Sequence, residues 1–165
     1  MNSLAIAFSG PSNSGKTTLI LNVALALRDR YKLAILKHDP SDKAIFDKEG
    51  KDSWKFSQTG AEVVVASPTR TTYLSKKEKS IDEIITMLGD FDILLVEGLK
   101  TLPLPRISVF RNTLDESYFS VSDALAIDAS VNLSDYKIPK HLAILDLNDT
   151  QAIVAWVLQN AKKVR

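Results

Sequence analysis

The stretch Gly10-Pro11-Ser12-Asn13-Ser14-Gly15-Lys16-Thr17-Thr18 decides the fold. It matches the pattern G-x-x-x-x-G-K-[ST], with an apolar run at residues 4–8 before it and a helical pattern at 19–27 after it. Strand, glycine-rich loop and helix in this order are the setting of a phosphate-binding loop. The glycines let the backbone turn around an anion, and loop N–H groups and the helix N-terminus then point at that anion. The sequence therefore predicts a P-loop NTPase, an α/β protein with a mostly parallel sheet flanked by helices.

Two side chains of this loop have specific expected roles. Lys16 is expected to reach the β- and γ-phosphates of a nucleotide, and the Thr17 hydroxyl is expected to bind Mg²⁺. The residues expected to contact the nucleotide are Gly10, Ser12, Asn13, Ser14, Gly15, Lys16, Thr17 and Thr18.

Composition restricts the class of protein. The chain has 165 residues, 45% of them hydrophobic, which predicts one P-loop nucleotide-binding domain over residues 1–165. The net charge of +1 gives no sign of nucleic acid or a membrane as the main partner. Cysteine is absent, which excludes disulfides and thiolate metal sites and agrees with a cytoplasmic protein. The chain starts directly with the first strand, so no signal peptide is expected.

The rest of the chain alternates strand and helix signals. The 4–9 strand is expected at the centre of the sheet, because it is apolar throughout. Further strands are expected at 33–36, 62–66, 71–74, 93–97, 106–111, 124–128 and 142–146. Helices are expected from 15 to about 29, from a cap at Asp52 or Ser53 to Gly60, from 81 to 88 after a Ser80–Glu83 capping box, and from about 148 onward. The strands at 71–74 and 106–110 are expected at sheet edges.

Glu97 is the second informative residue. It ends the run Ile93-Leu94-Leu95-Val96, so it lies at the carboxyl end of a buried strand. A nucleotide site of this kind places there the carboxylate that binds Mg²⁺ or its water. Asp92 begins the same strand, at the opposite edge of the sheet, and is expected to be structural.

A polar segment with mixed charges follows the second strand. Asp39 and Asp47 are candidates to orient an attacking water or to reach Mg²⁺ through water. Lys51, in Gly50-Lys51-Asp52-Ser53, offers a cation to an anionic ligand. The alternative for this segment is a solvated connector that ends in an ordinary helix cap.

Taken together, these pieces resemble the MobB-type proteins of molybdopterin-guanine dinucleotide biosynthesis over nearly the whole chain. The matching segments are Gly10–Thr18, Lys37-His38, Asp47-Lys48 with Gly50-Lys51-Asp52-Ser53, Gly60-Ala61, Val65-Ala66-Ser67, Leu95-Val96-Glu97-Gly98 with Lys100, Val109-Phe110-Arg111 and Leu145-Asp146-Leu147-Asn148-Asp149. The resemblance implies a homodimer that binds GTP with Mg²⁺, acts as a weak GTPase, and assists the guanylyltransferase that joins GMP to molybdopterin. It also makes molybdopterin a possible ligand.

The sequence departs from the family pattern in places. Asp39-Pro40 follow Lys37-His38 directly, where the family has further histidines, and no Asn/Thr-Lys-x-Asp motif is present to read guanine. Pro11 stands where some dimerising relatives carry a second lysine. Three other kinds of protein use the same loop. One is a small-molecule kinase, for which Arg70, Arg106 or Arg111 are candidate lid arginines. The others are a nickel-enzyme GTPase chaperone, which needs a Cys/His cluster, and a non-catalytic adaptor.

Overall fold

The computed structural model describes residues 3–165, and these form two compact units. One unit comprises residues 3–38 and 90–165, and the other comprises residues 39–89. The single domain over residues 1–165 stays a prediction. No helix within residues 3–165 is long and apolar enough to cross a bilayer.

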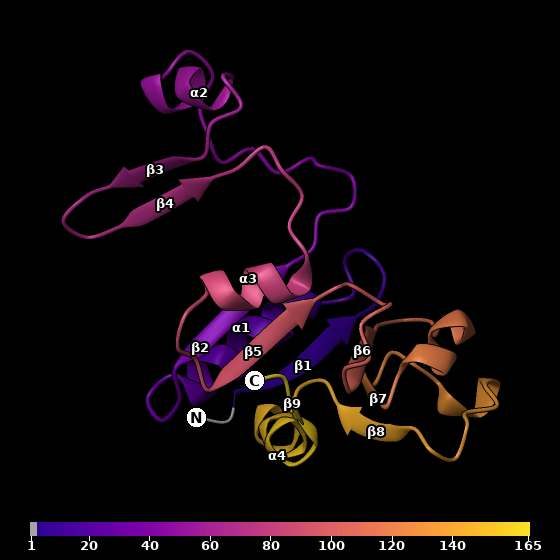
Figure 1. Ribbon diagram of the computed structural model, residues 1–165. Coiled ribbons are helices and arrows are strands. Elements are labelled where there is room, and N and C mark those ends of the chain that lie inside the picture. Colours follow the sequence, from indigo (N-terminus) through magenta and orange to yellow (C-terminus); the bar gives the residue numbers. More distant parts are fainter. Residues whose placement is uncertain (1–2) are drawn as a thin grey trace. The chain divides into compact units, whose positions relative to one another are not determined.

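The first unit is built on a sheet of seven strands among the described residues (Figure 1). Its order is β2 (Leu33–Lys37), β5 (Ile93–Glu97), β1 (Leu4–Ser9), β6 (Arg106–Phe110), β7 (Ala124–Ile127) and β8 (Ala143–Asp146), all paired in parallel. Only β9 (Lys162–Lys163) is antiparallel, beside the start of β1. The predicted α/β class and the central place of β1 are confirmed.

Two helices cover one face of this sheet. These are α1 (Lys16–Leu27) and α4 (Thr150–Asn160), which pack against each other and against the strands. Because side chains alternate along a strand, every second residue of the central strands enters this core. The strand residues in it are Ile6, Phe8, Ile93, Leu95, Ile107, Val109, Ala124 and Ala126.

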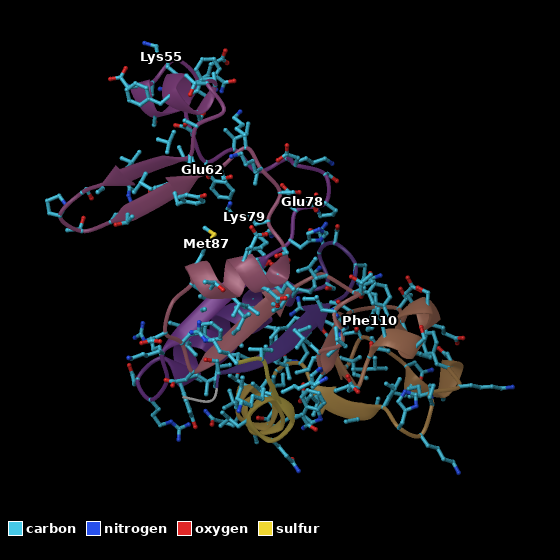
Figure 2. The ribbon with its side chains drawn as sticks, in the orientation of Figure 1. Lys55, Glu62, Glu78, Lys79, Met87 and Phe110 are labelled. Carbon is cyan, nitrogen blue, oxygen red and sulfur yellow. The ribbon has the colours of Figure 1, made fainter. Side chains whose placement is uncertain are left out.

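Short 3₁₀ turns cover the other face over β6 and β7. The turns are η1 (Glu116–Val121) and η2 (Leu133–Asp135), neither of which the sequence predicted. Phe110, at the end of β6 (Figure 2), meets the ring of Tyr118 edge to face at a centroid distance of 5.3 Å. This second cluster also holds Leu114, Phe119, Leu125, Ile127, Val131 and Leu142.

The expectation that strand 106–110 lies at a sheet edge is wrong. It pairs with β1 on one side and β7 on the other, and all five of its residues are buried. Arg106, at the start of this strand, is buried, and protein oxygens accept hydrogen bonds from its guanidinium.

The second unit contains α2 (Asp52–Ser57), the antiparallel pair β3 (Val63–Ala66) and β4 (Thr71–Leu74), and α3 (Ile81–Met87). The predicted Ser80–Glu83 capping box is confirmed. The predicted cap of α2 is wrong: Lys51 holds the N-cap position without a side-chain hydrogen bond. The Ser53 hydroxyl instead donates to Asp47, and α2 ends three residues before Gly60.

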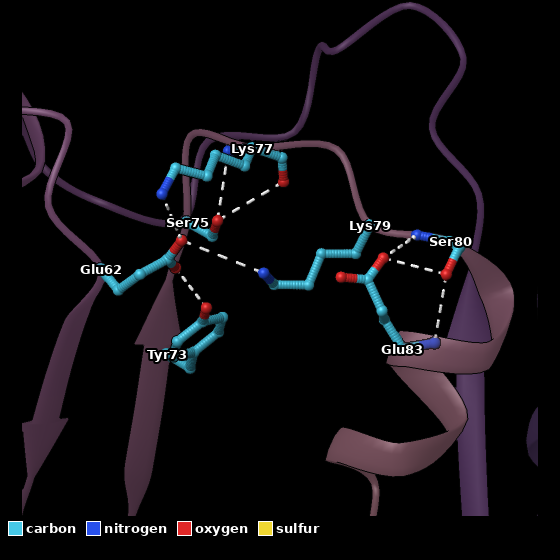
Figure 3. A network of polar contacts seen from close by, with 7 residues as sticks. All are labelled: Glu62, Tyr73, Ser75, Lys77, Lys79, Ser80 and Glu83. Carbon is cyan, nitrogen blue, oxygen red and sulfur yellow. Dashed lines mark hydrogen bonds and ion pairs between the residues drawn. The ribbon is translucent and has the colours of Figure 1, made fainter.

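A polar network within the second unit joins the β-hairpin to the start of α3 (Figure 3). Glu62 accepts a hydrogen bond from the Tyr73 hydroxyl, and its carboxylate lies 3.5 Å from Lys77 Nζ. Lys79 Nζ lies 3.9 Å from the same carboxylate, and Glu83 accepts from the Ser80 backbone N–H at 2.8 Å. The hydrogen bond from Tyr73 is the largest of the influences that lower the pKa of Glu62.

Candidate phosphate-binding site

The loop after β1 has the backbone of an anion cradle. Gly10 and Gly15 have φ angles of +136° and +95°, which residues with a side chain rarely adopt. A β-carbon at Gly10 would lie 2.4 Å from the carbonyl oxygen of Val109, so only glycine fits there. Asn13 is also left-handed, with φ of 61°. These turns curl the loop between β1 and α1, as the sequence predicted.

Ser14 supplies a polar group that fits an anion. It is 4% exposed, and its buried Oγ has no hydrogen-bond partner among the described residues. Leaving a buried hydroxyl unpaired costs about 1–3 kcal/mol. A phosphate oxygen held by this loop is an acceptor that would relieve this cost. Ser12, Asn13, Thr17 and Thr18 are exposed, Thr17 and Thr18 on the first turn of α1.

The amine of Lys16 folds over the loop. Its Nζ donates to the carbonyl oxygens of Gly10 at 2.9 Å and Pro11 at 2.8 Å. Burial lowers the pKa of Lys16, the nearby Glu97 opposes that shift, and Lys37 and Lys100 add to it. Three lysines and one glutamate therefore contribute to the electrostatic potential around this loop. The excess of positive charge favours an anionic ligand.

Glu97 lies at the carboxyl end of β5, at the same sheet edge as the loop. It is in register with Phe8 of β1 and Lys37 of β2. Its carboxylate lies 3.4 Å from Lys37 Nζ, and its side chain is 15% exposed. The structure thus brings Glu97 into the electrostatic environment of Lys16. Asp92, at the opposite end, accepts from the Lys32 N–H at 2.7 Å, which confirms its structural role.

Gly98 fixes the chain direction after Glu97. Its φ is +90°, and a β-carbon there would lie 3.2 Å from the Cβ of His38. The Gly98 N–H donates to the carbonyl oxygen of Phe8. The His38 N–H donates to the carbonyl oxygen of Glu97. His38 therefore packs against the turn that presents Glu97.

Arg106 is the residue of this region whose role the sequence reasoning missed. It is 1% exposed, and its guanidinium donates to four oxygens. The acceptors are Ser9 Oγ and the carbonyls of Gly98, Leu99 and Leu102, at 2.8, 2.8, 2.8 and 3.3 Å. Arg106 thereby ties the residue before the phosphate loop to the loop after Glu97. Burial lowers the pKa of its guanidinium. The only signal in the sequence was a cation inside an apolar strand.

The other predicted site residues belong to the second unit. Asp39 accepts from the backbone N–H groups of Lys43 and Ala44, both at 2.7 Å, and so organises its own loop. Asp47 accepts from the Ser53 hydroxyl at 2.8 Å through one oxygen, and its other oxygen is buried without a partner among the described residues. Lys51 is exposed just before α2.

No group of three or more His, Asp or Glu side chains suited to a metal ion exists within residues 3–165. Thr17 and Glu97 carry hard oxygen atoms of the kind that Mg²⁺ takes from a protein, since Mg²⁺ keeps several waters and takes its remaining ligands from phosphate oxygens.

Sequence comparison gives consistent matches. A family model described as molybdopterin guanine dinucleotide synthesis protein B matches residues 5–131. Two curated relatives are called molybdopterin-guanine dinucleotide biosynthesis adapter proteins. The one from Escherichia coli K12 is 30% identical, covering 96% of this chain and 93% of its own length. The one from Haemophilus influenzae is 27% identical, covering 92% and 86%.

Solved structures agree on the fold. Bacillus subtilis MobB superposes with a TM-score of 0.75 at 21% identity, covering 96% of this chain and 98% of its own. A structure described as molybdopterin-guanine biosynthesis protein B gives 0.70 at 24% identity, covering 94% and 99%. The hydrogenase maturation factor HypB of Archaeoglobus fulgidus gives 0.54 at 18% identity, covering 95% and 87%. The predicted P-loop NTPase fold is thereby confirmed.

Proposed function

Because the chain belongs to the family of molybdopterin-guanine dinucleotide synthesis protein B, we propose that it is a GTP-binding adapter in the assembly of that dinucleotide. It would assist a guanylyltransferase that joins GMP to molybdopterin, and molybdopterin itself is a possible ligand. The observation that carries the nucleotide-binding part is the loop from Gly10 to Lys16, whose buried Ser14 hydroxyl has no partner within residues 3–165. Calorimetric titration with GTP and with ATP tests it, with and without molybdopterin. Equal affinity for both nucleotides would contradict the guanine preference, and no binding of either would contradict the function.

The cation partner in this proposal is Mg²⁺, bound by Thr17 and by Glu97 directly or through water. Thr17→Ala removes a hydroxyl ligand and Glu97→Gln replaces a charged carboxylate with a neutral amide, while both leave the loop amides and Lys16 in place. We expect both variants to lose the Mg²⁺-dependent part of GTP affinity. Titrations with Mg²⁺ and with a chelator measure that part, and Lys137→Ala, at an exposed site, is the control. If the variants keep the parent's dependence on Mg²⁺, Thr17 and Glu97 are structural.

Hydrolysis is the less direct part of the proposal. We assign the protein a weak GTPase activity in which Glu97, Asp39 and Asp47 are the candidate catalytic carboxylates and Lys51 a candidate ligand-binding cation. Support comes from the buried Asp47 oxygen that has no partner in the described part of the chain and so keeps the capacity to accept a hydrogen bond from water. A small-molecule kinase is the alternative, and an assay of phosphoryl transfer to pterin, nucleoside and sugar acceptors distinguishes it from hydrolysis. Of its candidate lid arginines, Arg106 is 1% exposed, and both of its terminal nitrogens donate to protein oxygens, which argues against a lid role for it.

The protein is further proposed to be a cytoplasmic homodimer. Two-stranded sheets are marginal alone, and β3–β4 pairs with no third strand among the described residues. Val64 and Val65 are 59% and 44% exposed on β3, and Met87 is 50% exposed at the end of α3 (Figure 2). Exposed edges and apolar side chains of this kind favour pairing between chains. We expect sedimentation at micromolar concentration to give twice the monomer mass, and Val64→Lys to shift it toward monomer. A parent that sediments only as monomer contradicts the proposal.

A further inference from the structure

The phosphate loop has chemically different neighbours on its two sides. In the sheet, β5 and β2 lie on one side of β1, and β6, β7 and β8 lie on the other. Glu97 and Lys37 end β5 and β2, and both act on the Lys16 amine. Arg111 and Asp128 follow β6 and β7 directly, so they lie at the same carboxyl edge but across β1. A nucleotide bound along this edge would meet the Glu97–Lys37 pair at one of its ends and the Arg111–Asp128 pair at the other.

The guanidinium of Arg111 lies against the loop itself. A β-carbon at Gly15 would be 3.5 Å from its Cζ and Nε atoms and 3.6 Å from Nη2. Glycine therefore leaves this cation close to the backbone that precedes Lys16. The Arg111 side chain is 44% exposed, so the guanidinium remains accessible to a ligand.

Asp128 fixes the guanidinium from one side. Its Oδ2 lies 3.2 Å from Arg111 Nε, and its Oδ1 accepts from both the N–H and the hydroxyl of Ser130. The Ser130 hydroxyl in turn accepts from the Asn112 N–H at 2.7 Å. Asp128 is thus held on both oxygens, and its side chain is only 19% exposed. The ion pair uses Nε of Arg111, while its two terminal nitrogens have no hydrogen-bond partner among residues 3–165 and so remain suited to a phosphate.

We propose that Arg111 binds the α-phosphate of the nucleotide, so that the nucleoside end lies over the carboxyl ends of β6 and β7. The inference rests on the proposed nucleotide binding, and it adds the direction in which the nucleotide lies. Lys16, Thr17 and Glu97 account for the terminal phosphates and Mg²⁺ on the β5 side. The α-phosphate of an extended nucleotide then falls on the opposite side of the loop, beside Gly15. Arginine suits this position because its planar fork can place two N–H groups on one phosphate. Asp128 acts as a positioning residue through Arg111.

The test compares GTP and GDP, because both contain the α-phosphate and only GTP contains the γ-phosphate. For Arg111→Ala we expect both affinities to fall by the same factor, about tenfold, or about 1.4 kcal/mol at 25 °C. Mg²⁺ dependence and thermal midpoint should stay at parent values. Arg111→Lys should recover part of the loss. Arg28→Ala is the matched control, because Arg28 forms an exposed pair with Asp29 at the far end of α1.

Asp128 is tested through its coupling to Arg111. Asp128→Asn should weaken GTP and GDP equally and by less than Arg111→Ala. It should cost nothing further in the Arg111→Ala protein, an outcome that a merely structural carboxylate would not give.

The outcomes separate this inference from the function on which it rests. If the parent binds GTP and Arg111→Ala binds both nucleotides at parent affinity, the Arg111–Asp128 pair is a surface ion pair and the inference is wrong. A loss confined to GTP would place Arg111 at the γ-phosphate and would also overturn it. A parent protein that binds neither nucleotide removes the proposed function itself, and this inference with it.

Discussion

Replacing Lys16 with alanine is expected to weaken GTP binding by more than about tenfold, which corresponds to more than about 1.4 kcal/mol. The variant keeps the loop backbone, whose shape depends on Gly10 and Gly15. It loses the cationic side chain that belongs to the loop sequence itself. Lys37 and Lys100 remain nearby, but Lys37 is already paired with Glu97, and Lys100 lies over the ring of Tyr118 at 3.5 Å. Neither is free to take the place of Lys16 without losing a contact.

The fold of the Lys16→Ala protein should survive. In the structure the amine makes two hydrogen bonds, both to carbonyl oxygens of the loop, one of them exposed to solvent. Burial lowers the pKa of Lys16, so the folded protein disfavours its charged form relative to the unfolded chain. Removing the amine therefore removes a small destabilising effect along with two modest hydrogen bonds.

Titration calorimetry measures the affinity, and thermal unfolding checks the fold. Lys137→Ala is the matched control, because Lys137 is an exposed lysine between η2 and β8. GDP should lose less affinity than GTP if the amine acts mainly on the terminal phosphate. Parent-like affinity for GTP in the Lys16→Ala protein would mean that the loop binds no phosphate in the way proposed here.

The parts of this protein that follow local rules were predictable. The loop from Gly10 to Thr18, the central strand before it and the Ser80–Glu83 cap each depend on a few neighbouring residues with fixed spacing. Glu97 was placed at the right edge of the sheet because a buried run of four apolar residues ends on it. Chain-order rules for parallel sheets then place the two stretches together.

The parts that depend on distant partners were not predictable. Ser53 fits a helix cap by local pattern, but α2 already begins at Asp52, and the Ser53 hydroxyl, inside the first turn, donates to the distant Asp47. The strand at 106–110 was expected at an edge, since the sequence of one strand does not show which strands pair with it or which distant carbonyls accept from Arg106. The contact of Arg111 with Gly15 likewise joins residues from different elements, and no motif connects them.

Replacing Arg106 with methionine is expected to destabilise the protein by about 3–5 kcal/mol, a large part of the 5–15 kcal/mol typical of a domain. Two effects oppose each other. Methionine removes a buried charge, which favours folding because burial already lowers the pKa of this guanidinium. It also leaves four oxygens without their donor, among them the Gly98 and Leu99 carbonyls, at about 1–3 kcal/mol for each buried one. The second effect is larger, because three of the four acceptors are backbone carbonyls, which stay in place when the charge is removed.

The loss should be greatest in the loop that follows Glu97. Leu99 has a φ of 49°, a left-handed conformation that costs a residue with a side chain about 1–2 kcal/mol, and Arg106 donates to its carbonyl. Without that donor we expect residues 98–102 to exchange their amide hydrogens faster and Mg²⁺-dependent GTP binding to fall. Urea unfolding and hydrogen exchange measure both, with Arg28→Met as the exposed control and Arg106→Lys as a partial rescue. An unfolding midpoint equal to that of the parent would show that water satisfies these oxygens and that Arg106 does not hold the Glu97 loop in place.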